Sequence, residues 1–126
     1  MTLNNNLYRI QNIEKTETGF CVAAELCRES VIYQAHFPGM PITPGVCLLQ
    51  MAAEMLGEAL GKSLMLTGVK NAKFLSVVTP DEELNIVCRF SKIAENDNGE
   101  VSTTTTIQGV EGELRAKLSI TCQTVS

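Results

Sequence analysis

A mainly apolar stretch at residues 46–60 limits the fold of this chain more than any other feature. Its residue types favour a helix, which would be about 22 Å long at ~1.5 Å per residue. Thr43 is a suitable N-cap, Pro44 suits the first helical position, and Gly61 is expected to end the helix. Because its apolar residues occupy most of the circumference, the helix is expected to be buried on most sides.

The segments on either side alternate apolar and polar residues, which is typical of strands with one buried face. Strands are expected at residues 7–15, 20–28, 66–75, 84–91, 101–107 and 114–122, with a strong hairpin signal at 96–99. A curved antiparallel sheet wrapped around the helix packs these elements most economically. We therefore expect an α+β fold and one domain over residues 1–126, with a dimer covering the open flank of the helix.

Composition and charge exclude several classes of function. The net charge is −4 and no run of basic residues exists, which argues against nucleic-acid binding. Residues 1–6 lack the features of a signal peptide and are expected to be frayed. The apolar stretch carries Gln50, Glu54 and Glu58, so it is not expected to cross a membrane. The five cysteines show no CxxC spacing, and there is one histidine. We expect reduced thiols in the cytoplasm, with no metal and no cofactor.

The stretch HFPGMPITPGV, at residues 36–46, carries the chemistry of the sequence. His36 titrates near neutral pH, so it can act as a base. Three prolines restrict the loop, and the helix that follows presents unpaired backbone N–H groups and the positive end of its dipole. Gly45 allows a carbonyl to approach those amides closely. A rigid loop can thus hold a base opposite a site for a developing negative charge.

This stretch resembles the signature of the β-hydroxyacyl-acyl carrier protein dehydratases of fatty-acid synthesis, the FabZ/FabA group, which have the hot-dog fold. The family pattern reads approximately H-F-P-G-x-P-x-x-P-G-V, followed by an acid on the helix. The matching residues are His36, Phe37, Pro38, Gly39, Pro41, Pro44, Gly45 and Val46. Residues 72–84, AKFLSVVTPDEEL, resemble the family's P-G-D-x-L region less closely, because the Gly is absent.

The resemblance implies dehydration of β-hydroxyacyl thioesters of acyl carrier protein or coenzyme A to trans-2-enoyl thioesters. It implies that His36 is the base and that the N–H of Gly45 or Val46 binds the thioester carbonyl. The implied substrate-binding residues are Phe37, Pro38, Gly39, Gly45 and Val46. It also implies a homodimer or higher oligomer with the site at the interface. The acidic carrier protein would dock on exposed basic residues, for which the candidates are Lys70, Lys73, Arg89, Lys92, Arg115 and Lys117.

One catalytic position departs from the family pattern. The dehydratases carry Glu or Asp fourteen residues after the His, where this chain has Gln50, and an amide cannot deliver a proton. Glu54 shares a helix face with Gln50 and is expected to approach the same cleft. Three interpretations remain open. Either Glu54 or a water held by Gln50 replaces the acid, or His36 acts alone as base and then acid, or catalysis is altered and the chain is an acyl-binding subunit. An acyl thioesterase that uses Glu54 is a further alternative.

Overall fold

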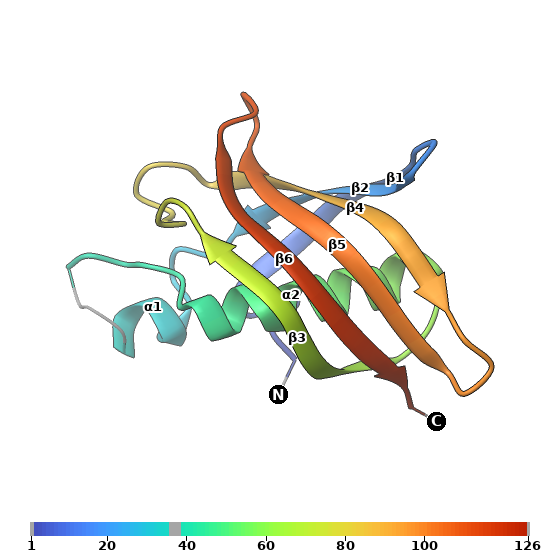
Figure 1. Cartoon of the computed structure of the whole chain (residues 1–126). Helices are drawn as coiled ribbons and strands as arrows, with labels where there is room; N and C mark the ends of the chain where they lie inside the picture. Colours follow the sequence, from blue (N-terminus) through green and yellow to red (C-terminus); the bar gives the residue numbers. More distant parts are fainter. Residues whose placement is uncertain (1, 36–38, 126) are drawn as a thin grey trace.

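The structure, a computed structural model, describes residues 2–35 and 39–125 and contains one six-stranded antiparallel sheet and two helices (Figure 1). The elements in chain order are β1 (Tyr8–Lys15), β2 (Gly19–Leu26), α1 (Val31–Ala35), α2 (Gly45–Leu60), β3 (Leu64–Phe74), β4 (Asn85–Glu95), β5 (Glu100–Gly109) and β6 (Leu114–Thr124). The strand order in the sheet is β1-β2-β4-β5-β6-β3, which leaves β1 and β3 at the edges. All six expected strands are present.

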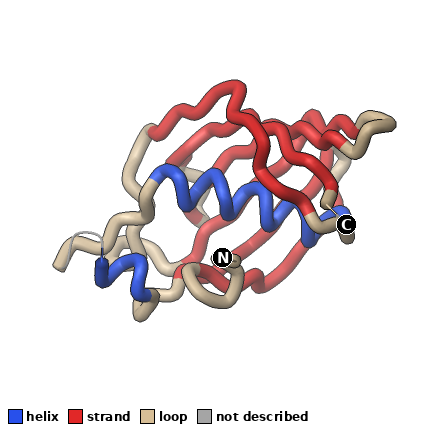
Figure 2. The backbone as a smooth tube through the Cα atoms, turned by 90° about the horizontal axis from the view of Figure 1, so that it is seen from below, coloured by secondary structure: helices blue, strands red, loops and turns tan. Residues whose placement is uncertain are grey.

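The long helix α2 lies across the concave face of the sheet (Figure 2). Its buried side chains are Leu48, Met51, Ala52, Ala53, Met55 and Leu56, and they share one core cluster with inward-facing strand residues such as Val22, Phe90, Ile107 and Leu118. The strands bury every second residue because successive side chains of a strand point to opposite faces. This arrangement is the hot-dog fold and confirms the predicted α+β class.

The two ends of α2 differ in how well the sequence predicts them. Gly61 ends the helix in a left-handed conformation (φ 69°), and its N–H donates to the Gly57 carbonyl, as expected for a glycine cap. The prediction that Thr43 caps the other end is wrong: Pro44 is the N-cap residue, without a side-chain cap. The Thr43 hydroxyl instead pairs with the Tyr33 hydroxyl at 2.7 Å, because burial of both groups requires each to find a partner.

Two segments are more ordered than the sequence indicates. The prediction of a frayed N-terminus is wrong for residues 2–6, because Leu3 is buried in the core and its backbone N–H donates to the side chain of Glu54 on α2. Residues 31–35, where no regular element was expected, form the short helix α1, and its Tyr33 is buried. Neither helix of the described ranges is long and apolar enough to cross a bilayer.

Candidate active site

The predicted base lies in the short gap between the two described ranges, 2–35 and 39–125. His36, Phe37 and Pro38 are outside the described residues, so their roles stay predictions. The chain enters this stretch from Ala35 at the end of α1 and leaves it at Gly39, which is exposed. Gly39 has φ 89°, a conformation that favours glycine and turns the chain toward the start of α2.

The N-terminus of α2 carries the predicted carbonyl-binding groups. Within the described residues, no acceptor is recorded for the N–H groups of Gly45 and Val46, whereas those of Cys47 and Leu48 donate to the Pro44 carbonyl at 2.9 and 3.1 Å. The Val46 side chain is exposed. Two free donors at the positive end of a helix dipole can stabilise an oxygen that gains negative charge.

A mainly apolar cavity of about 520 Å³ opens beside this helix terminus. It is lined by Ile42, Thr43, Gly45 and Leu48 on one side and, on the other, by residues 74–78, which are the last residue of β3 and the four that follow it. The Phe74 ring lies against Gly45, and a Cβ atom on Gly45 would be 2.9 Å from the Phe74 Cζ. Glycine therefore lets the ring close onto the start of the helix. The volume is within the range of small-molecule sites, and the lining suits an acyl chain.

Gln50 and Glu54 lie one turn apart on α2 and contact each other. The Gln50 Nε2 donates to Glu54 Oε2 at 3.0 Å. The same carboxylate accepts the backbone N–H groups of Leu3 and Asn4 at 2.8 to 3.1 Å and the Tyr8 hydroxyl at 2.9 Å. Burial raises the pKa of the Tyr8 phenol, and the adjacent Glu54 charge raises it further, so Tyr8 is a neutral donor.

In the part of the chain that the structure describes, the two helix residues, Gln50 and Glu54, are not part of the lining of the apolar cavity. Glu54 instead borders a smaller hollow with Thr2 and Asn4. The bond to Glu54 also fixes the orientation of the Gln50 amide, since its Nε2 faces the carboxylate and its Oε1 must point away. The contact of a helix carboxylate with the N-terminal segment was not predicted, because no sequence pattern links positions so far apart.

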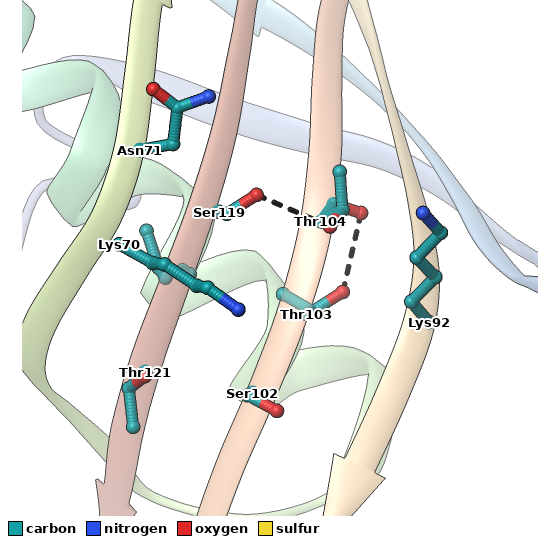
Figure 3. A pocket seen from close by; sticks show the side chains of 9 residues that line it. Lys70, Asn71, Lys92, Ser102, Thr103, Thr104, Ser119 and Thr121 are labelled. Atoms are coloured by element: carbon teal, nitrogen blue, oxygen red, sulfur yellow. Dashed lines mark hydrogen bonds between the residues drawn. The ribbon is translucent and has the colours of Figure 1, made fainter.

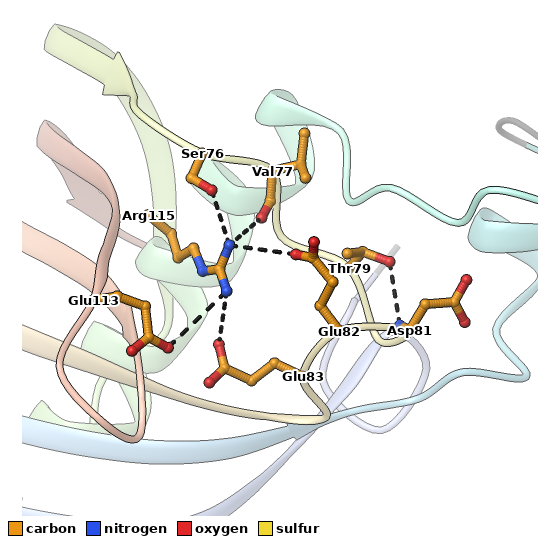
Figure 4. A network of polar contacts seen from close by, with 8 residues as sticks. All are labelled: Ser76, Val77, Thr79, Asp81, Glu82, Glu83, Glu113 and Arg115. Carbon is orange, nitrogen blue, oxygen red and sulfur yellow. Dashed lines mark hydrogen bonds and ion pairs between the residues drawn. The ribbon is translucent and has the colours of Figure 1, made fainter.

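Arg115, on β6, contacts Ser76 and Val77 of the cavity wall, and no pattern in the sequence distinguishes it from the other basic residues. Its side chain is only 15% exposed and lies among the carboxylates of Glu82, Glu83 and Glu113 (Figure 4). It was predicted as one of six candidates for carrier-protein docking. Its burial among acidic groups makes it the least accessible of them for an acidic partner.

A polar groove of about 470 Å³ lies on the other face of the sheet, away from α2 (Figure 3). Two of the remaining docking candidates, Lys70 and Lys92, lie on either side of it. Hydroxyl-bearing residues of β5 and β6 form its floor, including Ser102, Thr104 and Ser119. Apart from Ile120, the residues that line the groove carry polar side chains, so the cavity beside α2 is the stronger candidate for an acyl chain.

Comparison with known proteins decides the family. A family model described as ApeI-like, ApeI dehydratase, matches residues 12–110, which is most of the chain. The chain belongs to this dehydratase family. The 3-hydroxyacyl-[acyl-carrier-protein] dehydratase FabZ of Clostridium acetobutylicum is 34% identical over 97 residues, which cover 71% of this chain and 66% of that protein. FabZ of Latilactobacillus sakei is 32% identical with the same coverage. The match thus spans slightly less than two thirds of the length of these relatives.

Solved structures of other proteins have the same fold as this chain. The dehydratase heterocomplex ApeI:P from Xenorhabdus doucetiae superposes with a TM-score of 0.67 at 12% identity and covers 91% of this chain and 96% of that one. A putative thioesterase, yhdA, from Lactococcus lactis reaches 0.68 at 14% identity and covers 99% and 98%. Identities this low establish the hot-dog fold alone. The resemblance to the FabZ/FabA group is confirmed, and the roles of the individual site residues stay predictions.

Proposed function

We propose that this chain converts β-hydroxyacyl thioesters, carried on acyl carrier protein, to trans-2-enoyl thioesters. The supporting observation is an apolar cavity beside the start of α2, where the N–H groups of Gly45 and Val46 have no recorded acceptor among the described residues, in a chain of the ApeI-like dehydratase family. The curated relatives are described as acting on a 3-hydroxyacyl group attached to acyl carrier protein. The cavity would hold the acyl chain and the helix terminus would hold the thioester oxygen.

The proposed reaction removes water across one carbon–carbon bond. His36 takes the proton from the carbon next to the thioester carbonyl, and negative charge develops on the carbonyl oxygen. The N–H groups of Gly45 and Val46 stabilise that oxygen, and a single donor of this kind contributes about 10²–10³ in rate. The hydroxyl on the next carbon then leaves with a proton, as water, and the double bond forms.

The contacts of Glu54 limit which group can supply the proton to the leaving hydroxyl. Four donors converge on its carboxylate, so it must release one of them before it can donate a proton to a substrate. We therefore favour a water held by the Gln50 Oε1, or His36 acting first as base and then as acid. In either case Glu54 orients the Gln50 amide. The role of Glu54 as the acid itself is the alternative.

A homodimer that joins two β3 edges would complete the proposed site. β3 is an eleven-residue edge strand, and its Met65, Val69 and Phe74 side chains are 54%, 45% and 51% exposed. An edge of this length with apolar side chains favours pairing with another strand. Val69→Lys should therefore produce monomers in analytical ultracentrifugation. Val110→Lys, the same change in the exposed β5–β6 turn, is the matched control and should leave the dimer intact.

The activity is tested by mixing the purified protein with β-hydroxyacyl thioesters of several chain lengths. Enoyl absorbance should appear with the wild type and disappear with His36→Ala. Release of free thiol without enoyl product would instead identify a thioesterase, a possibility favoured by the thioesterase fold neighbours. Acyl binding without either product would identify a non-catalytic subunit. Copurification of a second hot-dog chain with the missing Glu would then name its partner.

A further inference from the structure

Burial of apolar side chains does little to hold one wall of the apolar cavity in place. It consists of residues 74–78, from the last residue of β3 into the loop that follows. Phe74, Leu75 and Val77 are 51%, 57% and 48% exposed, and only Val78 is buried in the core. Within one protomer, burial of these side chains contributes little, so hydrogen bonds are the main contacts that hold this wall against the rest of the chain.

Arg115 on β6 supplies most of these hydrogen bonds (Figure 4). Its backbone carbonyl accepts the N–H groups of Leu75 and Ser76 at 2.8 and 3.1 Å. Its guanidinium Nη1 donates to the Ser76 Oγ at 2.8 Å and to the Val77 carbonyl at 3.2 Å. One residue thus holds three consecutive residues of the wall, 75–77, through both its backbone and its side chain.

Three carboxylates fix the guanidinium in turn. Glu82 and Glu83 lie 3.5 and 3.4 Å from its nitrogens, and Glu113 lies 4.0 Å away. The planar, five-donor guanidinium can bind the wall and the carboxylates at the same time, and a lysine ammonium cannot reproduce this fork. The side chain of Arg115 is therefore held in one orientation rather than free in solvent.

The position of the wall affects the helix terminus directly. The Phe74 ring at the start of the wall lies against Gly45, next to the first backbone N–H groups of α2. Arg115 itself does not line the cavity. Any effect of Arg115 on substrate binding must consequently pass through residues 74–78.

We propose that Arg115 is a positioning residue that sets the shape of the acyl cavity by holding residues 75–77 against β6. This role rests on the proposed function, since it takes the ligand of the cavity to be the acyl chain of a thioester. Loss of the guanidinium would let the wall move outward, which weakens contacts with long chains more than with short ones. Binding of medium-chain substrates would suffer, and the chemical step would change little.

The test compares Arg115→Gln and Arg115→Lys with Lys15→Gln, a control on the exposed edge strand β1 that also removes one positive charge and for which no side-chain partner is recorded among the described residues. Steady-state kinetics would use short-chain and medium-chain β-hydroxyacyl thioesters. For both Arg115 variants we expect KM for the medium-chain substrate to rise about tenfold, with kcat changed less than about twofold. Ser76→Ala, which removes one contact of the guanidinium, should raise the same KM by about twofold to threefold.

A second measurement separates this proposal from the proposed activity. Isothermal titration calorimetry with a saturated medium-chain acyl-pantetheine thioester, which has no hydroxyl to eliminate, reports binding to the cavity without dehydration. Weaker binding by the Arg115 variants supports the proposal even if the wild type dehydrates nothing. Unchanged KM and binding in folded Arg115→Gln and Ser76→Ala proteins would overturn it, as would absence of binding by the wild type. An equal loss with Lys15→Gln would also overturn it, because the effect would then be one of charge.

Discussion

The Gln50 amide donates a 3.0 Å hydrogen bond to the Glu54 carboxylate, one turn further along α2, and that carboxylate also holds the N-terminal segment. The dehydratase pattern places an acid where Gln50 stands. The carboxylate at Glu54 is not simply the missing acid moved by one turn, because the fold already uses it as an acceptor for two backbone amides and the Tyr8 hydroxyl.

Replacing Glu54 by glutamine should destabilise the protein. An amide presents a donor to the N–H groups of Leu3 and Asn4, so at least one buried donor loses its partner, at a cost of about 2–4 kcal/mol. Urea denaturation measures this free energy. Glu58→Gln, an exposed change on the same helix, is the control and should stay within about 0.5 kcal/mol of the wild type. Equal midpoints for the two variants would contradict the structural role of Glu54.

Gln50→Glu should increase the rate of dehydration. The change places a second carboxyl group about 3 Å from that of Glu54. Two carboxyl groups this close share a proton, so the variant has an acid at the position where the family has one. We expect kcat to rise by about tenfold or more and to fall as the pH rises above the elevated pKa of the pair. The pH–rate profile of the variant checks this. Gln11→Glu on β1 is the control for added charge, and a rate no higher than that of the control would refute the prediction.

Thr43→Val should destabilise the protein, and Tyr33→Phe should recover part of the loss. The two hydroxyls pair at 2.7 Å in the core, and burial raises the Tyr33 pKa to about 12. Removing the Thr43 hydroxyl leaves the buried Tyr33 phenol without a hydrogen-bond partner and lowers the free energy of unfolding by about 1–3 kcal/mol. Removing both hydroxyls leaves no unpaired group. A double-mutant cycle in urea gives the coupling energy. Strictly additive single effects would be inconsistent with this pairing.

Glu113→Gln should flatten the pH dependence of stability. Burial, and then the hydrogen bond and charge of Glu113, raise the pKa of Glu83 in the folded state. A carboxyl whose folded pKa is raised binds more protons folded than unfolded, so stability falls as pH rises from about 4.3 through the folded pKa. Removing the Glu113 charge should weaken this fall. Thermal melts between pH 4 and pH 8 measure it, with Glu111→Gln in the neighbouring exposed turn as control. A slope as steep as that of the wild type would argue against the Glu83–Glu113 interaction.

Gly45→Ala should impair substrate binding more than stability. The added Cβ would lie 2.9 Å from the end of the exposed Phe74 ring, which can swing aside into the cavity. We expect a loss of stability below about 1 kcal/mol and a rise in KM of several-fold. The double variant Gly45→Ala/Phe74→Leu should restore KM in part, since the smaller side chain removes the collision. If KM stays raised by the same factor in the double variant, the Phe74 ring is not responsible.

The strands and the end of the long helix are predictable because the signals for them are local. Alternation of apolar and polar residues identifies the strands, since one face of each strand is buried. Gly61 ends α2 because a left-handed residue is least costly as glycine. The short helix α1 was missed, because it has five residues and is held by the buried Tyr33 rather than by periodicity.

The candidate site was predictable only in part, because some of its residues are neighbours in the sequence and others are far apart in it. The run from His36 to Val46 is contiguous, so a family pattern can identify it from sequence. The hydroxyl of Thr43 shows the limit: a local rule assigns it to a helix cap, but a buried phenol from another element takes it. The same limit applies to Arg115, whose partners lie on the loop after β3 and in the turn before β6.

The α+β class, the strands, the place of α2 and the family to which the chain belongs can be read from the sequence alone, because they depend on periodicity and on one contiguous motif. The folded chain was needed to find that Glu54 holds the N-terminal segment and orients Gln50, and that Arg115 holds a wall of the cavity. The reason is physical: a carboxylate or guanidinium binds whichever donors or acceptors the folded chain brings within about 3 Å, and packing sets those neighbours, not spacing in the sequence.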